Sequence, residues 1–101
     1  MKKQKLSLES AMEELKRSLP LLERDYKVKN LGVFGSYVHG EQKSRSDLDV
    51  LVEFYDPPSL LKFIEMEYYL SDLLGIKVDL VMKDALKPAI GKRILSDVIA
   101  V

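Results

Sequence analysis

The segment from Asp47 to Tyr55 constrains the fold most strongly, because apolar and polar side chains alternate along it. One set of alternate positions holds Leu48, Val50, Val52 and Phe54, and the other holds Asp47, Asp49, Leu51 and Glu53. Successive side chains of a β-strand point to opposite faces. The segment therefore predicts a strand that buries one face in a core and presents Asp47 and Asp49 together on the other. Pro57-Pro58 ends it.

Two other segments also predict strands. Residues Val28–Phe34 form a mainly apolar run that ends at Gly35, as expected of a buried strand. In Ile76–Met82, the apolar Val78, Leu80 and Met82 face one way and Asp79 faces the other. If this strand lies beside the one that carries Asp47 and Asp49, all three carboxylates converge on one open face of the sheet.

An amphipathic helix is predicted from Ser7 to Tyr26, where apolar residues recur at intervals of three and four. Ser7 is the expected N-cap, with Ser10 as an alternative. Pro20 is expected to break or kink this helix, because it lacks an N–H and clashes with the preceding turn.

Two more helices complete the pattern. Ser59 caps a helix that runs to about Leu74 and ends at Gly75. A short last helix opens at Asp84 or at Lys87-Pro88 and runs through Leu95. The order α-β-β-α-β-α predicts a small α/β or α+β architecture with helices flanking one sheet.

Three clustered carboxylates need a cation or protons beside them. Two like charges about 4 Å apart repel by roughly 1 kcal/mol in bulk water and about 4 kcal/mol at an effective dielectric constant of 20. Binding a cation or a proton relieves this repulsion. Ligand sets made only of oxygen select hard ions such as Mg²⁺, Mn²⁺ or Ca²⁺. Asp47, Asp49 and Asp79 therefore predict a Mg²⁺ site that receives a nucleotide phosphate.

A second feature lies just upstream of the D-x-D segment. The strand that ends at Phe34 leads into Gly35-Ser36 and a turn that extends to Gly40. Backbone N–H groups and a hydroxyl at a helix start can bind a phosphate, and glycine lets the ligand approach the backbone closely. The polar segment 41–46 then predicts a loop, and its Lys43 and Arg45 can reach phosphate oxygens.

Each of these features also has a simpler interpretation. A lone D-x-D on a strand is usually a solvated face, and a lone Gly-Ser turn is usually only a turn. Asp79 could be the charge that keeps an edge strand from aggregating, and Lys43 and Arg45 could be ordinary loop charges. The combination carries the prediction, because a phosphate turn precedes the D-x-D strand and a third aspartate faces the same way.

Composition limits the class of protein. The 101 residues include 16 basic and 16 acidic side chains, so the basic excess typical of nucleic-acid binders is absent and we expect no stable nucleic-acid binding. The lack of cysteine excludes disulfides and thiolate metal sites. The longest uncharged stretch, Asn30–Gly40, is far shorter than the ~20 apolar residues of a membrane span. We expect a cytoplasmic protein with no signal peptide and no membrane association.

The spacing of these residues resembles that of the DNA polymerase β-type nucleotidyltransferase superfamily, and within it the minimal nucleotidyltransferase (MNT) type. Gly35-Ser36, ten intervening residues and Asp47-Leu48-Asp49 reproduce the family pattern G-S-x₁₀-D-x-D. The segment Val78–Val81 is similar to the third-carboxylate strand of the family. The resemblance covers nearly the whole chain. It implies one minimal nucleotidyltransferase domain over residues 1–101, built on a polymerase β-like palm with a small mixed β-sheet.

The resemblance also implies a mechanism. Asp47 and Asp49 would hold two Mg²⁺ ions, and Asp79 would be the third ligand and a base for the attacking hydroxyl. Gly35 and Ser36 would hold the phosphates of a nucleoside triphosphate, so that AMP is transferred from ATP and pyrophosphate is released. Many relatives carry Arg where this chain has His39. Because histidine cannot hold a phosphate bidentately at any pH as arginine can, we expect weaker triphosphate binding.

The acceptor follows from the resemblance alone. A chain of this length is not expected to contain both this core and a template-binding or RNA-binding domain. Family members of this size resemble the antitoxin of HEPN/MNT toxin–antitoxin pairs, in which the MNT protein is thought to AMPylate a tyrosine of the HEPN ribonuclease. Two alternatives stay open: a non-catalytic antitoxin that only covers its toxin, and a nucleotidyltransferase for small molecules such as aminoglycosides.

Overall fold

Four helices and a sheet make up the structure, a computed structural model that describes residues 7–41 and 47–101. In chain order the elements are α1 (Leu8–Tyr26), β1 (Val28–Phe34), α2 (Ser36–His39), β2 (Leu48–Phe54), α3 (Leu60–Leu74), β3 (Val78–Met82), a 3₁₀ turn (Lys83–Ala85), α4 (Pro88–Asp97) and β4 (Ile99–Ala100). The expected order of three helices and three strands is therefore confirmed, with α2 and β4 added. No helix in the described ranges is both long and apolar enough to cross a membrane.

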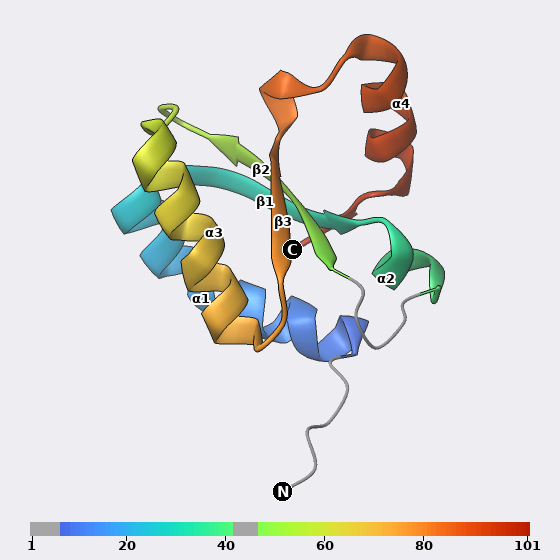
Figure 1. Ribbon diagram of the computed structural model, residues 1–101, viewed down its shortest axis with the longest axis horizontal. Helices are drawn as coiled ribbons and strands as arrows, with labels where there is room; N and C mark the ends of the chain where they lie inside the picture. Colours follow the sequence, from blue (N-terminus) through green and yellow to red (C-terminus); the bar gives the residue numbers. More distant parts are fainter. Residues whose placement is uncertain (1–6, 42–46) are drawn as a thin grey trace, which may run out of the picture.

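The sheet is mixed, as the family resemblance implies. Its strand order is β3-β2-β1-β4, and the first three of these strands are labelled in Figure 1. The central pair β1–β2 is antiparallel, β2–β3 is parallel, and β4 is antiparallel to β1. The strands β2 and β3 are direct neighbours, which is the condition under which the three aspartates were expected to share a face.

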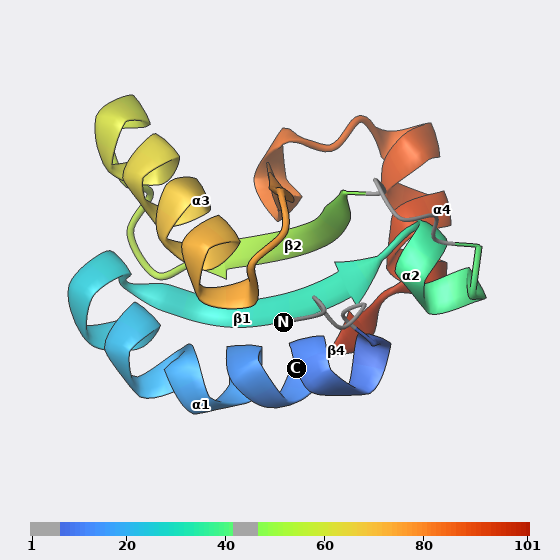
Figure 2. The ribbon, with the colours of Figure 1, turned by 60° about the horizontal axis from the view of Figure 1, so that its bottom comes forward.

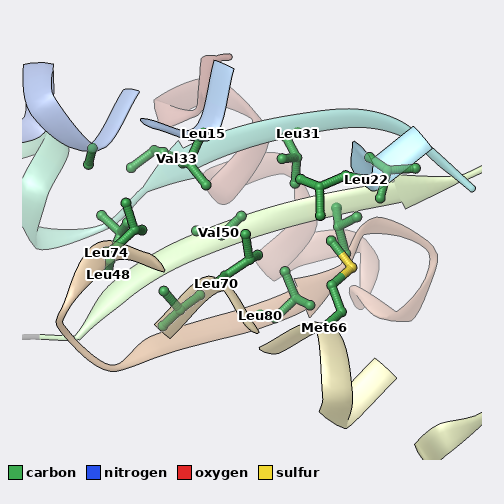
Figure 3. Packing of buried hydrophobic residues seen from close by; sticks show 14 of the residues in the cluster. Leu15, Leu22, Leu31, Val33, Leu48, Val50, Met66, Leu70, Leu74 and Leu80 are labelled. Atoms are coloured by element: carbon green, nitrogen blue, oxygen red, sulfur yellow. The ribbon is translucent and has the colours of Figure 1, made fainter. Parts of the chain in front are cut away.

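The core lies on one face of the sheet, where α1 and α3 pack against it (Figure 2). Leu15 and Leu22 of α1 and Met66 and Leu70 of α3 are fully buried there. They meet strand residues that point to the same side, among them Val33, Val50 and Leu80 (Figure 3). The alternation read from segment 47–55 is thus confirmed, since Leu48, Val50 and Val52 are all fully buried.

The helix α1 continues through Pro20, so the expected break is wrong. Ser7 is the N-cap and accepts a hydrogen bond from the Ser10 backbone N–H at 3.1 Å. A proline inside a helix removes the hydrogen bond to the carbonyl four residues earlier, here that of Lys16. Because Lys16 is exposed, water can satisfy that carbonyl. The burial of Leu15 and Leu22 on either side then holds the helix together.

The C-terminal strand β4 was not anticipated from the sequence. It pairs with β1 through Gly32↔Ala100 and Val33↔Ile99. A Cβ atom at Gly32 would collide with the Val98 side chain and lie 3.3 Å from the Ile99 carbonyl oxygen. Gly32 therefore allows the end of the chain to approach β1 closely, and this approach brings α4 to the sheet face opposite the core.

Candidate active site

Asp49 of β2 and Asp79 of β3 lie directly beside each other. They are register partners in the parallel β2–β3 pair, and neighbouring strands run about 4.8 Å apart. Both side chains leave the sheet on the face away from α1 and α3, because their neighbours Leu48, Val50 and Leu80 fill the core. Asp79 is exposed and Asp49 is partly buried. The structure thus brings together two of the three predicted carboxylates at a solvent-accessible position.

The pKa of Asp49 is raised above its ordinary value. Partial burial is the largest cause, and the negative charges of Asp79 and Asp47 add to it. Both effects disfavour the ionised carboxylate, the first by desolvation and the second by repulsion. In the described residues, no cationic side chain lies within ion-pair distance of Asp49 or Asp79. The site therefore has an excess of negative charge that a bound cation would relieve.

Asp47 stands at the start of β2 and is less closely joined to the pair. One of its carboxylate oxygens lies 3.7 Å from the Lys77 ammonium, although its charge still reaches Asp49. Within residues 7–41 and 47–101, no three acidic or histidine side chains stand close enough together to form a complete metal-ligand group. Asp49 and Asp79 are therefore the paired carboxylates, and Asp47 would have to leave Lys77 to join them.

The turn at Gly35 meets the acidic pair directly. Gly35 has φ 83° and ψ −151°, a backbone conformation that is essentially restricted to glycine. A Cβ atom at this position would overlap the Asp49 carboxylate oxygen Oδ2. The Gly35 carbonyl accepts hydrogen bonds from the Val38 and His39 N–H groups, at 3.1 and 3.3 Å. The predicted Gly-Ser turn thus exists as the short helix α2, and it lies against the D-x-D carboxylate.

Strand β3 is held in place by α3 at its free edge. The Leu80 N–H donates to Glu67 Oε2 at 2.8 Å, and the Val78 N–H donates to Ser71 Oγ at 2.9 Å. Asp79 stands between these two anchored residues. Glu67 and Ser71 were not predicted as supporting residues, because a helix side chain that caps a strand edge leaves no periodic signal in the sequence.

A family model of nucleotidyltransferase domains matches residues 13–101. The chain belongs to the nucleotidyltransferase family. A curated relative from Methanocaldococcus jannaschii, named as a candidate protein adenylyltransferase, is 56% identical over 88 residues, which cover 86% of this chain and 90% of that protein. The protein adenylyltransferase MntA of Thermococcus cleftensis is also 56% identical, over 79% of this chain and 81% of its own length.

Solved structures agree with this nucleotidyltransferase fold. A structure described as a candidate minimal nucleotidyltransferase superimposes with a TM-score of 0.83 at 31% identity, covering 98% of this chain and all of that one. A toxin–antitoxin structure with AMP-PNP gives a TM-score of 0.72 at 26% identity, covering 86% of this chain and 70% of that one. These findings confirm the family resemblance, the fold class and the assignment of the chain as a nucleotidyltransferase enzyme.

His39 of the nucleotidyltransferase connects two elements around the site. Its Nε2 atom lies 3.2 Å from Asp97 Oδ2, which joins α2 to the end of α4. Because both side chains are about half exposed, the interaction between them contributes little to the stability of the fold. The His39 side chain therefore contacts α4 in this structure. Lys43 and Arg45, the other expected phosphate contacts, lie outside the described residues.

Proposed function

We propose that this nucleotidyltransferase transfers AMP from ATP to a hydroxyl group of a partner protein, and that it is the antitoxin of a HEPN/MNT pair. The match to the nucleotidyltransferase family supports nucleotidyl transfer as the reaction. The name of the Thermococcus relative specifies a protein acceptor, and the toxin–antitoxin structure with AMP-PNP contains an ATP analogue. These relatives support both the nucleotide and the kind of partner. The cytoplasmic location stays a prediction.

One observation carries the proposal: Asp49 lies between Asp79 and the Gly35 turn. Asp79 is its register partner, and Gly35 must lack a side chain for the Asp49 carboxylate to fit. A phosphate held by the turn would therefore stand next to the acidic pair. The carboxylates and the triphosphate are both negatively charged and repel each other. Cations bound between them would remove this repulsion, and the arrangement leaves a position for such cations.

The donor set fits Mg²⁺, since all three candidate ligands are carboxylates. The pKa of Asp49 is raised by its partial burial and then by the charges of the other two. Asp47, Asp49 and Asp79 would hold the ions. When bound, two Mg²⁺ ions supply positive charge to the triphosphate and to the departing pyrophosphate. Ser36 and the backbone at Gly35 would position the phosphates, with Lys43 and Arg45 as further expected contacts.

Asp79 has a second role in the proposal. It is the exposed member of the pair, at the edge strand β3, so a hydroxyl from another protein can reach it. The Asp79 carboxylate would accept the proton of that hydroxyl as its oxygen bonds to the α-phosphorus of ATP. The bond from the α-phosphorus to the bridging oxygen breaks, pyrophosphate leaves, and the partner keeps AMP as a phosphodiester. A tyrosine is the acceptor that the HEPN/MNT resemblance implies.

The surface of α3 supports a protein partner. Leu60, Leu61 and Tyr68 expose 73%, 81% and 69% of their surface. Large apolar side chains that are gathered on one exposed helix are typical of protein interaction sites.

The transfer can be tested with ATP that carries its radiolabel on either the α-phosphate or the γ-phosphate. The chain, Mg²⁺ and a candidate HEPN partner protein are incubated, and label on that protein is measured. We expect label from α-labelled ATP only, and its loss in Asp79→Asn. The control Asp84→Asn, on the exposed 3₁₀ turn after β3, keeps full transfer.

The same experiment separates the alternatives. Tight binding of the HEPN protein without label, unchanged by Asp47→Asn, would instead show a non-catalytic antitoxin. Label that appears only on an added aminoglycoside would show a small-molecule nucleotidyltransferase. Label from γ-labelled ATP would indicate a kinase reaction and would contradict the proposal.

A further inference from the structure

The open face of the sheet carries three successive rows of side chains. Strand register places Phe34, Asp49 and Asp79 in one row, Gly32, Leu51 and Val81 in the next, and Asn30 with Glu53 in the third. The first row is acidic, the second is apolar and the third is polar. Glu53 follows Asp49 by four positions along β2, which is about 13 Å at the rise of a β-strand.

A cleft of about 140 Å³ lies over the second and third rows. Leu51 belongs to its sheet side, and Leu95 and Val98 come from α4 and the residue after it. Neither Asp49 nor Asp79 lines the cleft. The cleft begins at Leu51, which is the next residue of β2 on the same face as Asp49. It therefore adjoins the acidic pair without overlapping it, and its walls are mainly hydrophobic.

Polar groups close the far end of the cleft. Asn30 Nδ2 donates to Glu53 Oε1 at 2.9 Å, and the Lys83 ammonium lies 3.7 Å from the same oxygen. The Asn30 hydrogen bond lowers the pKa of Glu53, with a further contribution from the charge of Lys83. Glu53 is thus ionised at neutral pH. Both of these contacts use Oε1, and among the described residues no hydrogen bond reaches Oε2, which can accept one from a ligand.

We propose that this cleft binds the base of the nucleoside triphosphate, with the adenine ring between Leu51 and Leu95 and its amino group donating to Glu53. The inference rests on the proposed function, because the acidic row must hold the α-phosphate for the base to reach the third row. A nucleotide can bridge the distance between these rows. An apolar slot that ends in a few polar groups is the usual form of a site for a planar ring.

Glu53 then determines base selectivity. The Glu53 side chain is 23% exposed, and a base bound in the cleft would cover it. An acceptor that is covered in this way is left unpaired by an analogue that lacks the donor, so the site rejects such an analogue. The triphosphate of purine riboside differs from ATP only by the missing amino group. We expect the chain to bind it at least tenfold more weakly than ATP in calorimetric titrations with Mg²⁺ and no partner protein. In Glu53→Ala, the ratio of the two dissociation constants falls to about one.

A second variant tests the location of the base directly. Leu95 is 44% exposed, so Leu95→Trp can fill the cleft at little cost to folding. We expect this variant to lose most of its ATP affinity and to keep wild-type affinity for Mg²⁺-tripolyphosphate, which has no base. Ile90→Trp is the matched control, because Ile90 is 55% exposed on the same helix and does not line the cleft.

The outcomes separate this inference from the proposed function. Unchanged ATP affinity in Leu95→Trp, or an unchanged ratio in Glu53→Ala, would overturn the base assignment and leave nucleotidyl transfer intact. If Leu95→Trp lost transfer to a partner but kept its ATP affinity, the cleft would bind the acceptor. That result would also overturn the base assignment. Failure of the wild type to bind either ATP or tripolyphosphate would overturn both proposals.

Discussion

Gly35 and Asp49 occupy space that only one side chain can fill: a Cβ atom at Gly35 would overlap Asp49 Oδ2. The two residues come from the end of β1 and the start of β2, and the loop between them returns the chain antiparallel. The Gly-Ser turn and the D-x-D strand are therefore parts of one site, joined by direct contact.

Replacing Gly35 tests this contact. In Gly35→Ala the methyl group displaces the Asp49 carboxylate, and we expect nucleotidyl transfer to fall at least a hundredfold, equal to a loss of about 2.7 kcal/mol of transition-state stabilisation. Gly75→Ala is the control, because Gly75 also has a positive φ of 71° but has open space around its Cβ position. Each variant loses about 1–3 kcal/mol of stability from backbone strain. Equal activity in the two variants would refute the role of the contact.

Removing one charge from the acidic pair should stabilise the empty protein. In Asp49→Asn the repulsion from Asp79 and Asp47 disappears, so the melting temperature without Mg²⁺ rises by several degrees, at about 4–8 °C per kcal/mol for a domain of this size. Mg²⁺-ATP should then raise the wild-type melting temperature further and leave that of the variant unchanged. Equal stabilisation of both proteins by Mg²⁺-ATP would show that Asp49 does not hold the metal.

The same variant should show a defined pH dependence. Because the pKa of Asp49 is raised on folding, the folded chain keeps its proton to a higher pH than the unfolded chain does. The contribution of Asp49 to stability therefore falls as pH rises from the ordinary aspartate pKa of about 3.9 through the raised pKa. The difference in unfolding free energy between Asp49→Asn and wild type should grow over this window and then level off. A difference that shrinks with rising pH would contradict the assignment.

The anchoring of β3 by α3 can be tested through stability. Glu67→Ala leaves the Leu80 N–H without its acceptor, and we expect a loss of about 1–3 kcal/mol in urea unfolding. Asp72→Ala, an exposed change on the same helix, should stay within about 0.5 kcal/mol of wild type. If both variants unfold alike, Glu67 does not anchor the strand that carries Asp79.

Local patterns predicted most of this fold. The strand Val28–Phe34 was expected with the bounds that the structure has, and the alternation around Asp49 fixed which face of β2 is buried. Period-two spacing needs no tertiary information, because the pleat alone decides which side chains share a face. The same reasoning placed Asp79 opposite its apolar neighbours. The neighbouring position of the two strands was only a condition of the prediction, since no local signal specifies strand order, and the structure shows that the two strands pair.

Features that depend on contacts between distant residues were not predicted. The strand β4 has two residues, and it exists because Gly32 leaves room for Val98 and Ile99. The pairing of His39 with Asp97 joins residues 58 positions apart. Pro20 was expected to break or kink α1, and the helix continues through it. In each case a tertiary contact outweighs or adds to what the neighbouring sequence indicates.

Mn²⁺ titration in the presence of a non-hydrolysable ATP analogue tests the central claim most directly, because it measures the acidic site without requiring an acceptor. Isothermal calorimetry should show about two Mn²⁺ ions bound by the wild type with the analogue, as two-metal sites require. Asp49→Asn and Asp79→Asn should each lose this binding, and Asp84→Asn should keep it. Wild-type stoichiometry and affinity in both site variants would contradict the claim that Asp49 and Asp79 form the metal–nucleotide site.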